Sequence, residues 1–586
     1  MKANFELIIF TYVKGISPVV ASILTIIIVI ITTAGALFFI SRAVGGVSGK
    51  GEGIIEKTLE SAVPKVSILN VYAMNEKKGV ALFFPFEEGY GNTIEDWSRN
   101  GNNGTFYGEN FHDGTIYGAN WVIDSIKGKA LKFDGNEDYI NINHPDFNIT
   151  KAITMMAWVK RLGDYSKGNP YAPGWMRIVW LRSDTGLMSQ CACVVTSDGT
   201  RHCIGYGGVI PIGKWVHLAL TFENGTFCAY FNGSKINCLT DLPDELYPSD
   251  GVARIGGISD RWFNGIIDEV RIYNRVLNES EIKSIYENNT FIRKSLIAYW
   301  RFNEGKGNIA HDSHIWADGK FGYALSFDGV DDYVRVPDND SLDITGELAV
   351  EAWVKFDGFR PWQDIIARAG NTWSSCNPFG IEIKSNQNVS WYISTGCGQA
   401  RNIIKYNTTL ETNVWYHFVG VADSTQLRFY LNGKLKCNIS RSVDPCITDK
   451  PLTISAQIYS GPTWSATVAE AINGTIDEIR IYNRALTDDE VKLLYLGTIK
   501  VSLTSEGNIP INGSHVIIKG LSREYHCSGK LIVNKTYNGP ASLEANKIAD
   551  IYFSPRSFNC KLLDPGYYEL CLIISGKEIC KQFEVS

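Results

Sequence analysis

The sequence lacks the short motifs that mark several common enzyme classes. It contains no Gly-x-Ser-x-Gly, no His-Glu-x-x-His and no phosphate-binding loop, so hydrolase, zinc-protease and nucleotide-dependent chemistry have no signature here. It also contains no Cys-x-x-Cys, and no group of cysteines and histidines has the spacing of a structural zinc site. These absences favour a binding or structural role over catalysis.

An excess of basic residues is absent as well. The net charge is −6 and charged residues make up 20%, so we expect no nucleic-acid partner. Aromatic residues are abundant at 12%, with 15 Trp and 28 Tyr. Exposed aromatic rings suit contact with carbohydrate or protein, whereas buried ones form core. A chain of 586 residues is long enough for several domains.

One long apolar segment stands near the N-terminus. Residues 16–39 carry no charge over 24 positions. As a helix they would extend about 36 Å at roughly 1.5 Å per residue, enough to cross a hydrocarbon core of about 30 Å. The pattern therefore predicts a membrane-spanning helix over 16–44. The glycine-rich stretch that follows predicts a flexible neck over 45–64.

The residues before this segment are Lys14-Gly15-Ile16-Ser17-Pro18. They resemble the class III signal peptide of archaeal type IV pilins and archaellins. The resemblance implies that a prepilin peptidase removes a leader of residues 1–15 by cutting between Gly15 and Ile16, and that the helix then packs with other copies in a filament. Two alternatives stay open: an uncleaved membrane anchor, and a secretory signal removed near Ala34-Gly35-Ala36.

Thirteen cysteines occur, and the first is Cys191. Cys571 and Cys580 lie opposite each other if the segment between them turns at Ser575-Gly576, and Cys193 and Cys203 are symmetric about a Ser-Asp-Gly turn. Cys527 and Cys560 are further disulfide candidates in the C-terminal region. Such pairs fit an oxidising exterior, and the odd total leaves at least one thiol free or paired between chains. Sequons that are candidate glycosylation sites include Asn103, Asn148, Asn224, Asn407 and Asn473.

A unit of about 200 residues occurs twice. Phe133-Asp-Gly-x-x-Asp-Tyr139 matches Phe327-Asp-Gly-x-x-Asp-Tyr333, and the offset between copies grows from 194 residues there to 209 residues at Gly265 and Gly474. Other matched motifs are Ala-Trp-Val-Lys, Trp-x-His, and Gly-x-Ile-Asp-Glu-x-Arg-Ile-Tyr-Asn-Arg. A repeat of this length indicates two tandem domains, over 80–290 and 295–497.

These motifs resemble the laminin-G-like jelly roll of the concanavalin A-like superfamily. Alternating strands and Asn-Gly turns fit such a sandwich, and capping residues Asn278 and Thr487 predict a short helix at the end of each copy. The expected fold class is therefore mainly β: an N-terminal transmembrane or pilin helix, two tandem jelly-roll sandwiches, and a small disulfide-bearing, immunoglobulin-like β-sandwich over 498–586. We further hypothesise that a strand over 65–74 belongs to this last domain, with both jelly rolls inserted between them.

The resemblance also implies candidate binding residues. Calcium bound through hard oxygen ligands is the expected cofactor, with six aspartates as candidates: Asp134, Asp138, Asp268, Asp328, Asp332 and Asp477. The alternative is that these aspartates cap turns. Trp158, Trp353 and Glu351 are candidate glycan contacts, and the alternative is that the tryptophans and their strand neighbours His217 and His417 fill a second buried layer. A Glu-x-Asp-x-x-Glu catalytic motif is absent, so we expect no enzyme.

Taken together, the sequence predicts a cell-surface protein, anchored in a membrane or built into an extracellular filament. Its expected function is adhesion through glycan or protein binding by the two jelly rolls. A mainly structural subunit of a pilus-like filament is the first alternative, and an extracellular enzyme that acts on polysaccharides is the second.

Overall fold

A computed structural model describes most of residues 66–585. The residues outside the description are 1–65, 75–77, 99, 108–110, 164–174, 182–183, 259–260, 305, 369–376, 385–387, 396–400, 461–465, 507, 522–525, 534–536, 556–562, 564–565, 575–576 and 586. The expected leader, the cleavage site at Gly15 and Ile16, the apolar helix and the neck all lie outside it. Among the described residues, no helix is long and apolar enough to cross a membrane.

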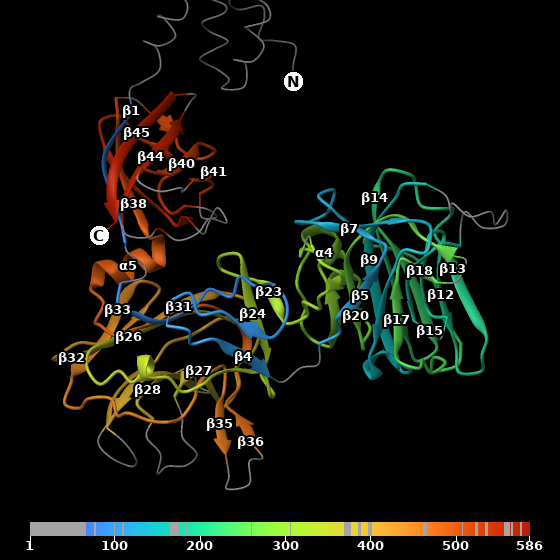
Figure 1. Ribbon diagram of the computed structural model, residues 1–586, viewed down its shortest axis with the longest axis horizontal. Coiled ribbons are helices and arrows are strands. Elements are labelled where there is room, and N and C mark those ends of the chain that lie inside the picture. The colour runs from blue at the N-terminus through green and yellow to red at the C-terminus, as the bar shows by residue number, and fades with distance from the viewer. Residues whose placement is uncertain are drawn as a thin grey trace, which may run out of the picture. The chain divides into compact units, whose positions relative to one another are not determined.

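The chain forms two compact units, and each is built from β-strands (Figure 1). The first combines Met1–Glu76 with Leu496–Ser586, and the second is Lys77–Tyr495. The first unit, which we call the head, joins segments from the two ends of the described chain. The second contains both jelly rolls.

The head is a small β-structure with its own core. In one sheet, β1 (Val66–Ala73) pairs with β38 (Ile499–Ser505), which pairs with β43 (Ile548–Phe553). The other strands are β41 (His526–Lys530), β40 (His515–Gly520), β44 (Gly566–Ile574) and β45 (Lys577–Val585) in one sheet, and β39 (Ile509–Pro510) with β42 (Ser542–Leu543) in another. Figure 1 shows the blue β1 among the red C-terminal strands. The hypothesised pairing of residues 65–74 with the C-terminal domain is therefore present, through Val71 opposite Val501.

The first jelly roll packs two sheets face to face around an apolar core. The sheet that remains free of helix contains β13 (Arg201–Gly205), β12 (Cys191–Val195), β11 (Gly186–Met188), β10 (Arg177–Leu181), β17 (Val252–Ile255), β8 (Tyr139–Asn143), β5 (Gly114–Tyr117) and β22 (Ile309–Ala310). The helix-covered sheet contains β16 (Ser234–Leu239), β15 (Thr226–Phe231), β14 (Trp215–Glu223), β9 (Ala152–Arg161), β20 (Asn264–Tyr273), β7 (Ala130–Asp134), β6 (Asn120–Val122) and β21 (Leu296–Trp300). The remaining elements are η1 (Pro145–Phe147), the hairpin of β18 (Gly257–Ile258) and β19 (Arg261–Trp262), and α4 (Glu279–Asn288).

The second jelly roll repeats this architecture. Its helix-free sheet contains β3 (Thr93–Ile94), β4 (Gly104–Tyr107), β25 (Tyr333–Val336), β34 (Leu452–Ile454), β27 (Trp362–Ala367), β28 (Phe379–Lys384), β29 (Val389–Ser394) and β30 (Arg401–Tyr406). Its helix-covered sheet contains β23 (Trp316–Asp318), β24 (Tyr323–Asp328), β37 (Asn473–Tyr482), β26 (Leu348–Phe356), β31 (Trp415–Ala422), β32 (Gln426–Leu431), β33 (Lys434–Ser440) and β2 (Val80–Phe84). The remaining elements are η2 (Asp340–Leu342), the hairpin of β35 (Gln457–Ser460) and β36 (Ala466–Ala469), and α5 (Asp488–Leu496).

The domain boundaries at 80–290 and 295–497 require correction, because the two copies exchange their first strands. Strand β2 pairs with β37, and β4 pairs with β25, so residues 80–107 complete the second jelly roll. Strand β21 pairs with β20, and β22 pairs with β5, so residues 296–310 complete the first. In Figure 1 the blue β4 lies in the yellow and orange second jelly roll. The first jelly roll is thus inserted into the second.

The ends of the two exchanged segments meet at residues 112–113 and 311–312. The backbone N–H of His112 donates to Asp312 Oδ2 at 3.0 Å, and the N–H of Asp312 donates to Asp113 Oδ1 at 2.8 Å. His311 Nδ1 lies 2.9 Å from Asp113 Oδ2. Two His-Asp dipeptides therefore bind each other where the chain enters and leaves the first jelly roll.

The local signals for turns and helix starts are confirmed. Asn232 and Asn432 occupy hairpin turns with positive φ of 49° and 53°. Helix α4 begins with the capping box of Asn278 and Glu281. Before α5, the N–H of Glu490 donates to Thr487 Oγ1 at 3.2 Å, and the N–H of Thr487 donates to a Glu490 carboxylate oxygen at 2.9 Å.

The strand exchange predicts which engineered cysteines can be cross-linked. Thr105 on β4 lies opposite Arg335 on β25. Directly opposed strand residues have Cα atoms about 4.5–5.5 Å apart, a separation that a disulfide can span. The double variant Thr105→Cys/Arg335→Cys should therefore oxidise to a disulfide, which peptide mass spectrometry of the non-reduced protein detects.

The matched control tests the tandem arrangement without exchange. There β4 would take the place of β5 beside β8, where Thr115 faces Asn141, so Thr105→Cys/Asn141→Cys would be the pair that cross-links. A disulfide in this control, together with none in the first variant, would contradict the exchange.

Candidate functional site

The outer face of one sheet in each jelly roll is closed by the C-terminal helix. Trp158 stacks on Tyr286 of α4 with ring centroids 5.4 Å apart, and Trp353 stacks on Tyr495 of α5 at 5.6 Å. Trp353 is 1% exposed and Glu351 is 0% exposed. The assignment of Trp353 and Glu351 to a glycan site is therefore wrong, because both are buried. Trp158 is half-buried, and Tyr286 of α4 occupies the ring face where a sugar would stack.

Glu351 belongs to a buried ion network under α5. Its Oε1 accepts from Arg480 Nη1 at 3.0 Å and lies 3.0 Å from His417 Nε2. Burial alone would raise the pKa of Glu351, but Arg480 and His417 hold it below its usual value. The matching residue on β9 of the first jelly roll is the apolar Met156. His217, also buried, has its pKa lowered to about 3 by burial and by Arg271, so these groups form the second buried layer.

The six aspartates proposed as calcium ligands all accept hydrogen bonds from backbone N–H groups, four of them within their own turns and two from a distant loop. Asp138 Oδ2 accepts from the N–H of Asp134 at 2.8 Å, and Asp332 Oδ2 accepts from the N–H of Asp328 at the same distance. Asp268 accepts from the N–H of Ile126 at 2.8 Å, and its pKa is raised by burial and by the neighbouring Glu269. The remaining members accept in the same way: Asp134 from Asn136, Asp328 from Val330, and Asp477 from Phe321. The turn-capping alternative describes the four in the Phe-Asp-Gly-x-x-Asp motifs, whereas Asp268 and Asp477 are buried strand residues that bind the backbone of a distant loop.

One acidic group among these residues has oxygens close enough for a shared cation. Carboxylate oxygens of Asp328, Asp331 and Asp332 lie within 4.8 Å of one another. Asp332 Oδ2 is also 3.0 Å from Arg293 Nη2, which already neutralises part of the charge.

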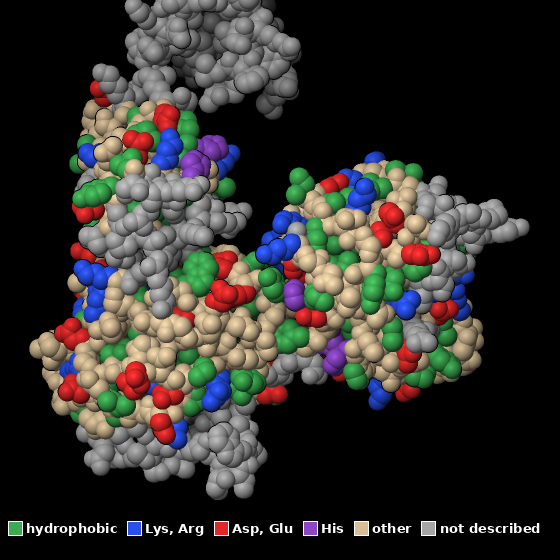
Figure 2. Space-filling view, in the orientation of Figure 1, with side chains coloured by type: hydrophobic (Ala, Val, Ile, Leu, Met, Phe, Trp, Pro, Cys, Tyr) green, Lys and Arg blue, Asp and Glu red, His purple; other side chains and the backbone are tan. Residues whose placement is uncertain are grey.

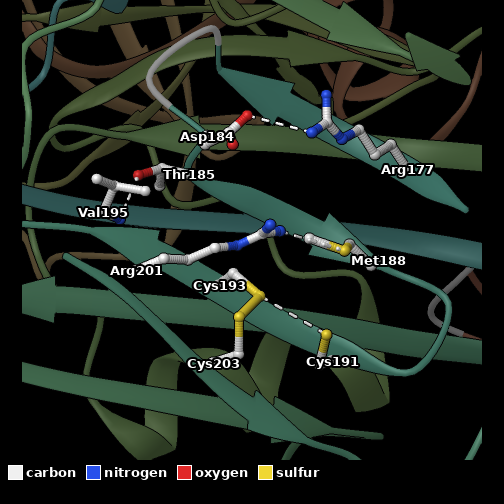
Figure 3. The surroundings of a disulfide bond; sticks show 9 residues. All are labelled: Arg177, Asp184, Thr185, Met188, Cys191, Cys193, Val195, Arg201 and Cys203. Atoms are coloured by element: carbon white, nitrogen blue, oxygen red, sulfur yellow. Dashed lines mark hydrogen bonds and ion pairs between the residues drawn. A yellow bond between two sulfur atoms is a disulfide. The ribbon is translucent and has the colours of Figure 1, made fainter. Parts of the chain in front are cut away.

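The helix-free face of the first jelly roll is rich in arginine and aromatic rings. The Arg177 guanidinium lies 3.9 Å from the centre of the Trp180 ring, and Arg201 lies 5.6 Å from it. Figure 3 shows Arg201 beside the Cys193–Cys203 disulfide on this sheet. The buried free thiol of Cys191 lies 3.6 Å from Cys193 Sγ, and burial raises its pKa.

Both jelly rolls carry a stacked tyrosine pair at the same place on this face. Tyr117 and Tyr139 stack with centroids 4.7 Å apart and a 15° angle, and Tyr107 and Tyr333 stack at 5.2 Å and 14°. Tyr117 is 46% exposed and Tyr107 is 41% exposed. In the first copy the Arg254 guanidinium lies 5.1 Å from the Tyr139 ring centre. We call these the tyrosine pairs.

The same face of the second jelly roll carries buried acids. Asp364 on β27 lies opposite Glu382 on β28, and its N–H donates to the Glu470 carbonyl at 2.8 Å. Asp364 is 3% exposed. Burial raises its pKa well above the usual value, and the charges of Glu470 and Glu382 raise it further. Asp364 therefore holds a proton at pH values where exposed aspartates are ionised.

The two disulfides that hairpin symmetry predicts are confirmed. Cys193 bonds Cys203 and Cys571 bonds Cys580. Cys527 is disulfide-bonded too, and Cys560 lies outside the described residues. The bond between Cys228 and Cys238 was missed because a bulge at Ala229 and Tyr230 shifts the partner by one residue from simple counting about the Asn232-Gly233 turn.

The candidate glycosylation sites differ in exposure. Asn103, Asn148, Asn224 and Asn407 are exposed, whereas Asn473 is half-buried. On the face that Figure 2 presents, acidic and basic side chains are interspersed, without an extended basic patch among the described residues.

Sequence reasoning also missed the tyrosine pairs, although a signal was present. Tyr139 and Tyr333 end the repeated Phe-Asp-Gly-x-x-Asp-Tyr motif, and Tyr107 and Tyr117 both end a Gly-Thr-x-Tyr motif within the first 120 residues. Both Gly-Thr-x-Tyr motifs precede the first copy of the Phe-Asp-Gly motif, and none precedes the second copy directly. This arrangement indicates that one of the two motifs belongs to the second jelly roll.

Comparison with known proteins gives one family match. The family described as the concanavalin A-like lectin/glucanases superfamily matches residues 134–283 and 328–492. A search of curated proteins gives no match.

Several solved structures align with parts of the chain. Mouse laminin α1 domains LG4-5 align at 10% identity over 62% of this chain and 92% of that chain, with a TM-score of 0.21. Domain 4 of the extracellular arabinanase AbnA from Geobacillus stearothermophilus, in complex with arabinotriose, aligns at 21% identity over 37% and 100%, with a TM-score of 0.24. The CBM40 of the Ruminococcus gnavus IT-sialidase, bound to α2,3 sialyllactose, aligns at 16% identity over 27% and 86%, with a TM-score of 0.24.

The buried acid predicts a pH-dependent stability. The pKa of Asp364 is higher in the folded than in the unfolded chain, where it is about 3.9. Asp364 therefore contributes most to the free energy of unfolding below pH 3.9, and this contribution is lost as the pH rises through the folded-state pKa. Asp364→Asn, a neutral residue of similar size, should unfold a few degrees above the wild type at pH 7 and at a similar temperature at pH 4. Thermal melts followed by circular dichroism measure this. Equal melting temperatures of the two proteins throughout this range would contradict the raised pKa.

Proposed function

Because the chain belongs to the concanavalin A-like lectin/glucanases superfamily, we propose that it is a cell-surface binding protein that presents two laminin-G-like jelly rolls to a glycan. Adhesion follows if the glycan belongs to another cell or surface. The proposal for the binding face rests on one observation, the exposed tyrosine pair that recurs in both copies.

The tyrosine pairs have the chemistry that sugar binding needs. A ring face stacks on the C–H face of a pyranose, and a phenol hydroxyl at the ring edge offers a hydrogen bond. Arg254 beside Tyr139 adds a planar donor for hydroxyl or carboxylate groups, and its Nε donates to Asn141 Oδ1 at 3.2 Å, which fixes its position. The helix-covered face offers no comparable surface, because Trp353 is buried.

The anchor remains the proposal that the sequence makes. The apolar segment 16–39 would place the chain in a membrane or a filament core, after removal of residues 1–15 by a prepilin peptidase. Support comes from the head: β1, which follows the proposed neck, pairs with C-terminal β38. The pilin resemblance implies a β-domain directly after the helix, and the head has this place in the chain. A mainly structural subunit of a filament is therefore the second candidate function.

Calcium also remains a prediction. The group of Asp328, Asp331 and Asp332 is the place where the described residues would hold it.

We propose binding rather than catalysis for the acids of the second jelly roll. Hydrolysis of a glycosidic bond needs two carboxyl groups roughly 5–9 Å apart on either side of the bond. Asp364 instead shares a side-chain hydrogen bond with Glu470, so this pair leaves no room for a sugar between them. A polysaccharide-acting enzyme stays the alternative, and Glu382, which lies opposite Asp364, is a candidate second carboxylate for it.

The tyrosine pairs predict the outcome of a glycan-binding experiment. The purified chain is applied to an array of neutral and acidic oligosaccharides, and affinity for the best ligand is then measured by calorimetry. Tyr117→Ala/Tyr139→Ala and Tyr107→Ala/Tyr333→Ala each remove one pair. Loss of one stacked ring costs about 0.5–1.5 kcal/mol, so the double variant of the binding copy should lose about 1–3 kcal/mol, or roughly five- to 150-fold in affinity.

Tyr567→Ala is the matched control, because Tyr567 is an exposed tyrosine of the head at 56% exposure. It should bind as the wild type does. Binding that survives both double variants would place the site elsewhere, and no binding to any array glycan would remove the glycan function.

The anchor proposal is decided by the N-terminus of the native protein. Protein recovered from the cell surface should begin at Ile16 and sediment with sheared filaments or membranes, as N-terminal sequencing of each fraction shows. A chain that keeps Met1, or one that begins near residue 37 in the supernatant, is incompatible with pilin-type processing.

A further inference from the structure

Three of the nine histidines come together with two aspartates in the first jelly roll. His112 precedes β5, His144 and Asp146 flank and form η1, and Asp312 and His314 follow β22. They come from three separate stretches, so no spacing rule detects them. His112 and His314 are almost fully buried, at 3% and 1% exposed, and Asp312 is 0% exposed.

Three of these side chains have the geometry of a metal site. His112 Nε2 lies 3.0 Å from Asp146 Oδ2, and His144 Nδ1 lies 3.3 Å from the same oxygen. The ligand atoms of the three residues all lie within 4.8 Å of one another. Ligands about 2.0–2.1 Å from a tetrahedral metal ion are roughly 3.3 Å apart, so an ion fits among them with small shifts.

A buried carboxylate sits behind the central histidine. His112 Nδ1 lies 2.9 Å from Asp312 Oδ2. A metal-binding histidine usually donates its other ring N–H to a carboxylate, which fixes the tautomer and turns the free lone pair toward the metal. Here that partner leaves Nε2 of His112 as the ligand atom, and Nε2 faces Asp146 and away from Asp312.

The equivalent position in the second jelly roll shows which hydrogen bonds the backbone needs there. Asp96 there takes the role of Asp312: it accepts from the N–H groups of Asn102, Phe83 and Ser98 at 3.0, 3.0 and 2.9 Å. Asp312 accepts from the matching N–H groups of His112, Tyr299 and His314 at 3.0, 2.9 and 3.1 Å. The two scaffolds are therefore the same, hydrogen bond for hydrogen bond.

The side chains on this common scaffold differ in chemistry. Asn102 Nδ2 donates to Ser341 Oγ at 2.8 Å where His112 faces Asp146. Asn339 caps η2 at 3.0 Å, whereas His144 accepts from the N–H of Asp146 at a long 3.4 Å. Neutral amides and hydroxyls thus satisfy the fold in one copy, and the other copy replaces them all with imidazoles and a carboxylate. The fold does not explain that replacement.

We propose that the first jelly roll binds a divalent transition-metal ion such as Zn²⁺ through His112, His144 and Asp146, with Asp312 orienting His112. The second jelly roll has no such site at its matching residues. Two imidazoles and one carboxylate leave a coordination position open. Asp146 and His144 are 39% and 27% exposed, and His112 and Asp146 line a cavity of about 1090 Å³, so the open position is accessible to water or to an oxygen of a bound ligand.

Calcium does not fit this site. Calcium takes six to eight oxygen ligands, and two of the three ligand atoms here are imidazole nitrogens. The alternative for the same residues is an imidazolium of His112 that donates to both Asp146 and Asp312, with no metal. The metal site and the metal-free imidazolium are distinguished by whether the protein binds Zn²⁺.

The test is a titration of the chelator-treated full chain with ZnCl₂ by calorimetry, with the melting temperature as a second readout. The expected result is one tight site per chain, a rise in melting temperature with Zn²⁺, and no competition from CaCl₂. His112→Asn and Asp146→Ser install the residues of the second copy, so the fold should persist, and each should weaken binding at least tenfold. His144→Asn repeats the test at a partly exposed position and leaves the buried residues unchanged.

The reverse exchange makes the test sharper. Asn102→His/Asn339→His/Ser341→Asp places the three ligands on the scaffold around Asp96 and should raise the stoichiometry from one ion to two. His515→Asn, an exposed histidine of the head, is the control and should bind as the wild type does. A wild-type chain that takes up no Zn²⁺, or one whose tight site survives both His112→Asn and Asp146→Ser, would overturn the proposal.

Discussion

The structure depends on the pairing of one strand edge in each jelly roll. Strand β20 pairs with β7 along residues 264–267 and with β21 along residues 270–273, and β37 divides in the same way between β24 and β2. A left-handed glutamate, Glu269 or Glu478, stands at the point of division. An edge left open there would expose unpaired backbone groups beside an apolar core, so each long strand needs a second short partner. That partner can come from either end of a repeat.

This freedom explains the nested topology. Residues 80–94 and 296–310 are close equivalents: β2 and β21 are similar apolar strands, and the short β3 and β22 follow them. Strands β2 and β21 pair with equivalent edges, on β37 and β20. Strand β4 corresponds to β5, so the first segment also gives the second jelly roll a strand that 296–310 lacks. In a tandem arrangement the first segment would belong to the first jelly roll and the second segment to the second. The structure has the reverse, and the two His-Asp dipeptides bind each other where the segments cross. Since β1 and β38 likewise enclose the second unit, each domain is completed only after the domain inside it has been synthesised.

The sequence predicts the parts of this fold that local chemistry determines. Asn-Gly turns, the capping residues Asn278 and Thr487, alternating strands and two hairpin disulfides need only neighbouring residues, and they are correct. The strand exchange and the helix over Trp353 involve long-range partners that alternation cannot identify, because a strand face covered by a helix and one open to solvent can both carry aromatic residues. Counting outward from the Asn232-Gly233 turn places Cys228 opposite Asn237, so the bulge hides its pairing with Cys238 from the sequence. Four of the six aspartates lie in turns, while Asp268 and Asp477 lie in strands, and residue type alone does not distinguish backbone capping from calcium binding.

Internal repetition gives a way to separate what the fold needs from what function adds. Where both copies keep a residue, as at Asp96 and Asp312, the backbone hydrogen bonds explain it. Where the two copies carry different residues on the same backbone structure, the fold tolerates both residues. Met156 in place of Glu351 shows that this carboxylate is optional for the sandwich, whereas both copies keep the buried pair of arginine and glutamate, Arg271 with Glu269 and Arg480 with Glu478. Placing the buried imidazole of His112 where an amide suffices costs desolvation, which the contacts with Asp312, Asp146 and the His144 ring offset in part. Such a replacement persists only if another interaction offsets that cost, and a bound cation at His112 is one that the geometry allows.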